Sequence, residues 1–210
     1  MAVNSLYNIV DSYFVAQYSE DAMTALALVF PVQNLINAVT IGFGIGVNAV
    51  TAYYLGARQE EKAYRAATQG VFLNLAHGVI LAGGCILFMP LFLRAFTSVQ
   101  DIIDQALIYS NRAFLFAPMI ALSLSYEKIF QSVGRMKETM ICMMCGFVTN
   151  IILDPLMIFG IGFFPALGAA GAAYATGIGQ CVTVAVYLLL YKIRPIPIKI
   201  AKEYVSKDRE

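Results

Sequence analysis

Two aspartates stand in segments whose other residues are mostly hydrophobic. Asp11 shares one helix face with Asn4 and Asn8, and Asp154 shares a face with Asn150 one helical turn earlier. Ionisable groups inside a membrane are costly, so they are functional candidates by default. Burial and mutual repulsion of two carboxylates favour protonation of one of them. The pair therefore predicts a group that takes up and releases a proton near neutral pH.

Pro155 directly follows Asp154 and gives a second reason to expect a binding site there. Proline cannot donate a backbone hydrogen bond to the carbonyl of Ile151, and it disfavours helical geometry at the residue before it. A bent helix with a free carbonyl, an amide and a carboxylate offers the groups of a cation or proton site. The alternative for both aspartates is a residue at a helix end whose side chain reaches the membrane interface.

Other polar residues are candidates for the lining of a cavity. Asn8 lies on the face of Asp11, and Gln33, Asn34 and Asn37 form a polar patch in the second apolar run. The patch is equally consistent with a cavity lining and with hydrogen bonds to neighbouring helices.

The composition is that of a membrane protein. Of the 210 residues, 60% are hydrophobic and 13% are charged. A soluble domain of this length could not bury so much apolar surface in one core, whereas a bilayer can accommodate it. The net charge of +1 comes with no basic stripe, so no nucleic-acid partner is expected. A single histidine, the lack of a nucleophile–base pair and the lack of a metal-ligand cluster argue against an enzyme. No cofactor is expected besides a coupling ion.

The apolar runs predict an all-α integral membrane protein, a bundle of six transmembrane helices. A spanning helix needs about 20 mostly apolar residues, and the first run, which carries Asp11, falls short of this length. We expect the beginning of that helix to be missing. The expected spans lie approximately at residues 1–16, 22–55, 66–93, 105–127, 139–160 and 166–191. They form one lobe over residues 1–192, and residues 193–210 form a polar tail that leads toward a second lobe.

Basic residues gather on one side of the bundle if the spans alternate in direction. The loops at 56–65 and 128–138 and the tail after the last span hold twelve of the fourteen Lys and Arg residues. By the positive-inside rule these loops and the tail are cytoplasmic.

Several segments resemble the multidrug and toxic compound extrusion (MATE) transporters, most of all their bacterial DinF-like branch. The first-helix segment around Asp11 and the Asn-x-x-x-Asp-Pro segment that begins at Asn150 carry the most specific similarity. The similar segments follow in order at residues 6–15, 25–31, 46–48, 54–57, 131–135, 150–156 and 168–176.

The resemblance implies a protein of twelve helices in two six-helix lobes around a central cavity, located in the bacterial cytoplasmic membrane. Such proteins export cationic and amphipathic compounds in exchange for H+ or Na+. Carried over to this sequence, the coupling site comprises Asp11, Asn150, Asp154 and Thr176, with Tyr109 as a further member, and the first four are also the candidates to hold Na+. The chain then corresponds to the N-terminal lobe, and a second lobe is the expected partner besides the bilayer and small cationic substrates.

Two other functions stay open at this level. One is a flippase-like carrier of lipid-linked sugars, which has the same general architecture and would need cationic cavity residues; Arg112 is the main one here. The other is a membrane interaction subunit that transports nothing.

Overall fold

The structure is a computed structural model that describes the backbone of residues 2–205 and the side chains of residues 9–201 and 203–205. Every regular element in this range is helical, as the sequence predicts. The elements are α1 (Ala2–Tyr18), α2 (Glu20–Gly56), α3 (Glu60–Phe96), α4 (Gln100–Leu115), α5 (Ala117–Ser132), α6 (Met136–Phe159), α7 (Ala169–Ile193) and the short 3-10 helix η1 (Lys202–Val205).

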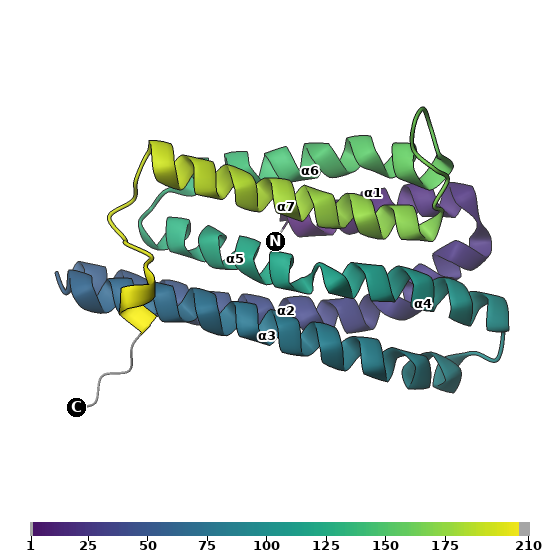
Figure 1. The fold of residues 1–210 in the computed structure, drawn as a ribbon, viewed down its shortest axis with the longest axis horizontal. Coiled ribbons are helices and arrows are strands. Elements are labelled where there is room, and N and C mark those ends of the chain that lie inside the picture. The colour runs from purple at the N-terminus through teal and green to yellow at the C-terminus, as the bar shows by residue number, and fades with distance from the viewer. Residues whose placement is uncertain (1, 206–210) are drawn as a thin grey trace.

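Most of these helices are long and apolar enough to cross a membrane. Among the described residues, α2, α3, α6 and α7 qualify singly, and α4 and α5 qualify together as a pair bent by 43°. α1 has 17 residues, which gives a length of about 26 Å. With α1 included and α4 and α5 taken as one bent segment, the described residues form six helical segments. The segments lie approximately along one axis (Figure 1). The all-α membrane fold class is confirmed.

One expected span is interrupted. Where the sequence predicts a single span over residues 105–127, the structure has two helices that meet at Phe116. Pro118 lies in the first turn of α5, and its ring nitrogen cannot donate to the carbonyl of Phe114. Helix α7 leaves room for the break, because Gly177 has no side chain and faces the Phe116 ring. The predicted span thus corresponds to a bent helix pair, and the proline is the physical reason for the break.

The helices are arranged in three rows, with α4 and α5 in the middle. Helices α6 and α7 lie side by side along one edge, and α2 and α3 along the other (Figure 1). Helix α1 packs against α6 and α2. Helices α6 and α7 approach closely at Gly171, where a Cβ atom would lie 2.5 Å from the carbonyl oxygen of Met157 on α6. The absence of a side chain thus lets two backbones touch, as small residues do in membrane helix pairs.

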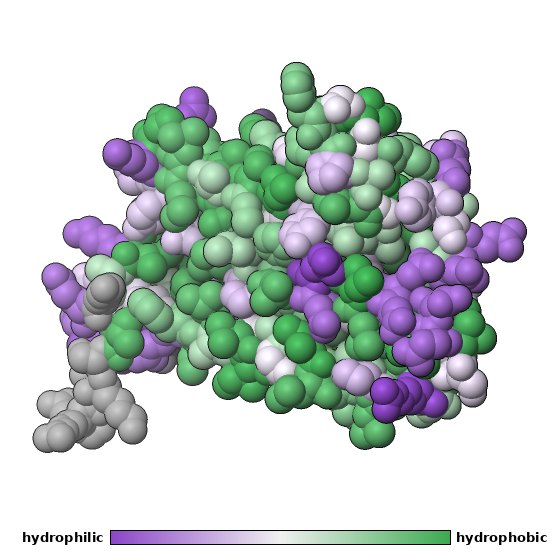
Figure 2. Space-filling model, turned by 45° about the vertical axis from the view of Figure 1, so that its right-hand side comes forward, coloured by the Kyte–Doolittle hydropathy of each residue, from purple (hydrophilic) through white to green (hydrophobic). Residues whose placement is uncertain are grey.

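The outer surface is hydrophobic over most of the middle of the lobe. In Figure 2 green residues cover most of the central part, and purple residues gather toward the two ends. On α3, for example, Ile80, Leu87 and Leu91 are 68%, 83% and 70% exposed. Contact of such a surface with water is unfavourable, whereas contact with lipid tails is favourable. The exposed residues are therefore consistent with insertion in a bilayer.

The chain after α7 folds back onto the lobe. Ile196 and Ile198 are buried, and the hydroxyl of Tyr191 donates to the carbonyl oxygen of Ile198 over 2.9 Å. In Figure 1 this segment crosses from the end of α7 to α3. Within the predicted tail over residues 193–210, this part packs on the lobe because alternate isoleucines give the extended segment one apolar face to bury. Residues 206–210 lie outside the described residues.

Candidate ion-coupling site

Four of the residues named from the sequence meet inside the lobe. Asp11 lies on α1, Asn150 and Asp154 on α6, and Thr176 on α7. The amide nitrogen of Asn150 donates toward Asp11 Oδ1 at 3.1 Å and Asp154 Oδ1 at 3.2 Å. It also lies 3.3 Å from the hydroxyl oxygen of Thr176, which itself donates to Asp11 Oδ2 over 2.8 Å. We call these four side chains the carboxylate cluster.

Asn150 lies at the centre of the carboxylate cluster, and its amide nitrogen has fewer N–H hydrogens than it has oxygen acceptors around it. A side-chain amide carries two N–H hydrogens, and three oxygen acceptors lie within hydrogen-bond distance of that nitrogen. At least one contact is therefore less than a full hydrogen bond. A proton or a cation added at either carboxylate would redistribute these contacts, so the cluster can respond to the ion that it binds.

Both carboxylates are enclosed by protein. Asp11 is 4% exposed and Asp154 is 0% exposed, so neither side chain reaches the membrane interface as the helix-end alternative requires. Within the part of the chain that the structure describes, no Lys, Arg or His forms an ion pair with either residue. A buried carboxylate without a compensating cation is costly. The cluster therefore needs a proton or a metal cation from outside to compensate its charge.

The chemistry of the carboxylate cluster fits either of these. Asn150 Oδ1 and Asp154 Oδ2 are buried and have no hydrogen-bond partner among the described residues. Together with the other carboxylate and the Thr176 hydroxyl they offer oxygen ligands of the kind that Na+ takes in transporter sites. The same atoms can accept a proton.

Helix contacts next to the carboxylate cluster hold α6 against α7. The backbone N–H of Leu167 donates to the carbonyl of Met157 over 2.9 Å, and that of Gly168 donates to Ile158 over 3.2 Å. These bonds satisfy carbonyls at the end of α6 that have no partner within the helix. Gly160 has a φ of 72° and ends α6 in the left-handed conformation that glycine favours. The connection thus brings α7 back alongside the last turns of α6, which carry Asp154.

A pocket begins at the carboxylate cluster and extends along α5. It is partly open to the surroundings, and its lining includes Asp11, Thr176 and Glu127. Gln33 and Asn37 of α2 line it. Asp11 and Thr176 therefore belong both to the carboxylate cluster and to the pocket lining.

Tyr109 is buried close to this pocket but outside the carboxylate cluster. Its hydroxyl accepts a hydrogen bond from the amide of Gln33 over 3.0 Å. Among the described residues, no hydrogen bond joins it to Asp11 or Asp154. The structure thus places Tyr109 beside the site, with Gln33 as its direct partner.

Of the other residues predicted to line a cavity, some line this pocket and one does not. Gln33 and Asn37 line the pocket, whereas Asn34 points to the exposed surface and is not part of the lining. Gln33 and Asn34 face different directions because successive helix positions lie about 100° apart, and a cavity-lining role for Asn34 stays a prediction. The side chain of Asn8 lies outside the described residues.

Four polar residues of the pocket were not predicted from the sequence: Ser123, Glu127, Gln180 and Thr183. Gln180 and Thr183 follow Thr176 at the spacing that places residues on one helix face, and both line the pocket. That spacing, applied to α7, would have found them. The sequence does not mark Glu127 as a pocket residue, because an acidic residue at the end of an expected span, beside the basic Lys128, is typical of a loop.

Comparison with known proteins identifies the family. The family model MatE matches residues 1–156. The chain belongs to the MATE family. A FAD transporter of Shewanella oneidensis is 30% identical over 90% of this chain and 42% of its own length. The multidrug export protein MepA of Staphylococcus aureus is 26% identical over 94% of this chain and 44% of its own. The chain thus spans less than half the length of these relatives.

Solved MATE structures have the same fold. A crystal structure of a MATE protein in a bent conformation superposes with a TM-score of 0.90 at 28% identity, over 99% of this chain and 46% of the other. A MOP-superfamily transporter of Pyrococcus furiosus, described as having a binding pocket of reversed polarity, gives 0.89 over 100% and 46%. The chain therefore has the fold of one portion of a MATE transporter, and it is a multi-pass membrane protein with relatives that export drugs.

Proposed function

We propose that this chain is the N-terminal lobe of a secondary active exporter, which exchanges H+ or Na+ for cationic or amphipathic compounds. Asp11, Asn150, Asp154 and Thr176 bind the coupling ion, and a second lobe completes the central cavity. The protein lies in the bacterial cytoplasmic membrane with its basic loops on the cytoplasmic side. It catalyses no chemical reaction and needs no cofactor besides the ion.

The observation that carries this proposal is the pair of buried carboxylates without a protein cation. Asp11 and Asp154 are 4% and 0% exposed, and no ion pair compensates them among the described residues. A permanent structural pair would be expected to have its own counter-ion, because uncompensated buried charge destabilises a fold. A site that is compensated only by a transient ion is suited to coupling.

The position of the pocket supports exchange. Asp11 belongs both to the carboxylate cluster and to the pocket lining. A coupling cation at Asp11 and a cationic compound in the same pocket repel each other in a medium of low dielectric. Binding of one therefore favours release of the other, which is the requirement for antiport.

The lining also favours a cationic, partly apolar substrate. Its ionisable residues are Asp11 and Glu127, and no Lys or Arg belongs to the described lining. Phe114, Ile120 and Leu124 supply apolar contacts. The relative named as a FAD transporter indicates a different cargo class, since a flavin dinucleotide is anionic. Such a cargo would need cationic groups that this pocket lacks among its described residues.

The test is export by the complete transporter in proteoliposomes. An imposed H+ or Na+ gradient should drive export of a fluorescent organic cation, and the Asp11→Asn variant should insert normally but lose the dependence on the gradient. FAD serves as the second cargo. Export of FAD without export of the cation would overturn the proposed substrate class. Transport of neither, with normal insertion, would favour an interaction subunit.

A further inference from the structure

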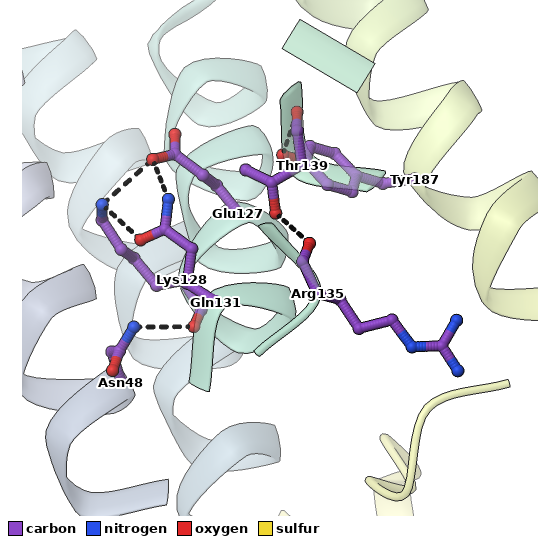
Figure 3. A network of polar contacts seen from close by, with 7 residues as sticks. All are labelled: Asn48, Glu127, Lys128, Gln131, Arg135, Thr139 and Tyr187. Carbon is purple, nitrogen blue, oxygen red and sulfur yellow. Dashed lines mark hydrogen bonds and ion pairs between the residues drawn. The ribbon is translucent and has the colours of Figure 1, made fainter. Parts of the chain in front are cut away.

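The same pocket contains a second acidic residue, which lies outside the carboxylate cluster. Glu127 lies on α5 and is 6% exposed, yet it contributes to the pocket lining. Its neighbours are Lys128 and Gln131, also on α5. Figure 3 shows these three side chains joined by hydrogen bonds and an ion pair. We call them the α5 triad.

Only one oxygen of the Glu127 carboxylate is used in the α5 triad. Oε1 accepts from Lys128 Nζ over 3.0 Å and from Gln131 Nε2 over 2.9 Å. No hydrogen bond joins Oε2 to any described residue, as the unmarked oxygen in Figure 3 illustrates. An ionised carboxylate has about four acceptor positions. Oε2 therefore keeps acceptor capacity for a donor that enters the pocket.

Lys128 has an anchored backbone and an ammonium group that is free to move on its side chain. Its ammonium donates to Glu127 and, over 3.0 Å, to Gln131 Oε1. Its stem lies against Gly44 of α2, where a Cβ atom would be 2.9 Å from Lys128 Cγ. Its backbone carbonyl accepts from Asn48 Nδ2 over 3.1 Å. The backbone of Lys128 is thus anchored, whereas the ammonium ends a flexible four-carbon stem.

The ion pair is also one that a ligand can compete with. Glu127 and Lys128 are sequence neighbours, and adjacent helix positions do not face each other. The lysine side chain, 16% exposed, must therefore bend along the helix surface to reach the carboxylate. An ordering cost of this kind weakens ion pairs between long side chains. A ligand cation in the pocket has no such cost from the protein.

From these contacts we propose that Glu127 binds the ammonium group of the exported compound, and that Lys128 is the built-in competitor which occupies the carboxylate when no substrate is present. This inference rests on the proposed function and names the substrate-binding group. Apolar residues such as Ile120 and Leu124 line the pocket with Glu127, so an ammonium with an apolar body satisfies both. The coupling ion then has the carboxylate cluster to itself.

The experiment measures equilibrium binding to the purified complete transporter with two matched fluorescent probes. Dansylcadaverine carries an ammonium at neutral pH, and its N-acetyl derivative has nearly the same size and no charge. Glu127→Gln should weaken binding of the ammonium probe by roughly tenfold, as expected for loss of a hydrogen bond to a charged group. It should leave binding of the acetylated probe unchanged.

A second variant separates substrate binding from a structural role. Lys128→Met keeps the apolar stem and removes the competing ammonium, so it should tighten binding of the ammonium probe by a few-fold. Glu61→Gln is the matched control, because Glu61 also forms an ion pair, with Arg65 at 2.9 Å, but is 70% exposed and outside this pocket. It should change binding of neither probe.

Two outcomes would overturn the inference. Equal loss of both probes in Glu127→Gln, with a lower unfolding temperature, would make the α5 triad a structural contact between helices. Unchanged or weaker binding of the ammonium probe in Lys128→Met would exclude competition. Ion-driven efflux by the unmodified protein, measured in parallel, tests the proposed function separately. Charge-dependent binding without such efflux would support the Glu127 site while contradicting the antiport proposal.

Discussion

The carboxylate cluster and the α5 triad are two solutions to the placement of acidic groups inside one lobe. In the cluster, Asp11 and Asp154 come from different helices and share one amide, that of Asn150. In the triad, Glu127 and Lys128 are neighbours in sequence and compensate each other's charge. The carboxylate cluster depends on the tertiary fold to assemble it, and on a proton or cation from outside to compensate its charge. The α5 triad has both its charges on one helix.

The difference has a consequence for mechanism. A carboxylate that carries its own counter-ion has a stable ionised state whatever the ion gradient. A buried pair without one changes its state when a proton or cation binds. We therefore expect the cluster to sense the gradient and the triad to respond to the charge of the cargo. Each of the following changes acts on one side of this comparison.

The largest effect is expected from neutralising the carboxylate cluster. Asp154→Asn keeps the shape and removes the charge, so gradient-driven export should fall by roughly a hundredfold or more, as for an essential intramembrane carboxylate. Initial efflux rates in proteoliposomes with and without the gradient measure this. Glu61→Gln is the control for removal of a single negative charge. Export that still follows the gradient in Asp154→Asn would remove Asp154 from the coupling site.

A large loss of stability is expected where backbone contact supports the carboxylate cluster. Gly171→Ala would force a Cβ atom against the carbonyl of Met157, 2.5 Å away, and should lower the free energy of unfolding by about 1–3 kcal/mol, as overpacking does. Thermal unfolding in detergent measures it. Gly42→Ala is the control, because nothing lies within 4 Å of its added Cβ. Equal melting temperatures for the two variants would contradict the α6–α7 contact.

A moderate effect is expected from the Thr176 hydroxyl, which donates to Asp11 Oδ2 over 2.8 Å. Thr176→Val keeps the volume but removes this donor and one oxygen ligand, so apparent affinity for the coupling ion should change by roughly tenfold. Thr176→Ser should retain most of the affinity. Ion titrations of efflux provide the measurement. If Val and Ser behave alike, the hydroxyl takes no part in ion binding.

The smallest effect is expected at the anchor of the α5 triad. Asn48→Ala removes the hydrogen bond to the Lys128 carbonyl and should cost about 1 kcal/mol of stability, the usual value for one hydrogen bond. Gradient coupling should be unchanged, because the carboxylate cluster is untouched. Chemical or thermal unfolding and efflux, measured on the same preparation, test both statements. A loss of coupling would show that the two acidic centres are not independent.

Local patterns in the sequence were enough to predict the class of fold and to single out the two aspartates that the structure brings together. Long apolar runs predict membrane helices because a bilayer requires continuous apolar segments. Asp11 and Asp154 stand out because charge in such segments is rare. Helical spacing links Asn150 with Asp154, since residues four apart share a face. Thr176 and Tyr109, in contrast, entered only through the family resemblance.

The tertiary structure decided what no local pattern contains. It placed Asp11 beside Asp154 across two helices, put Asn34 outside the pocket, and folded Ile196 and Ile198 onto the lobe. These outcomes depend on which helix faces meet, and that is set by packing over the whole bundle. The sequence by itself thus determined which side chains are costly to bury, through local composition and periodicity. Only the fold determined which of them share one site, because contacts between distant segments arise from packing.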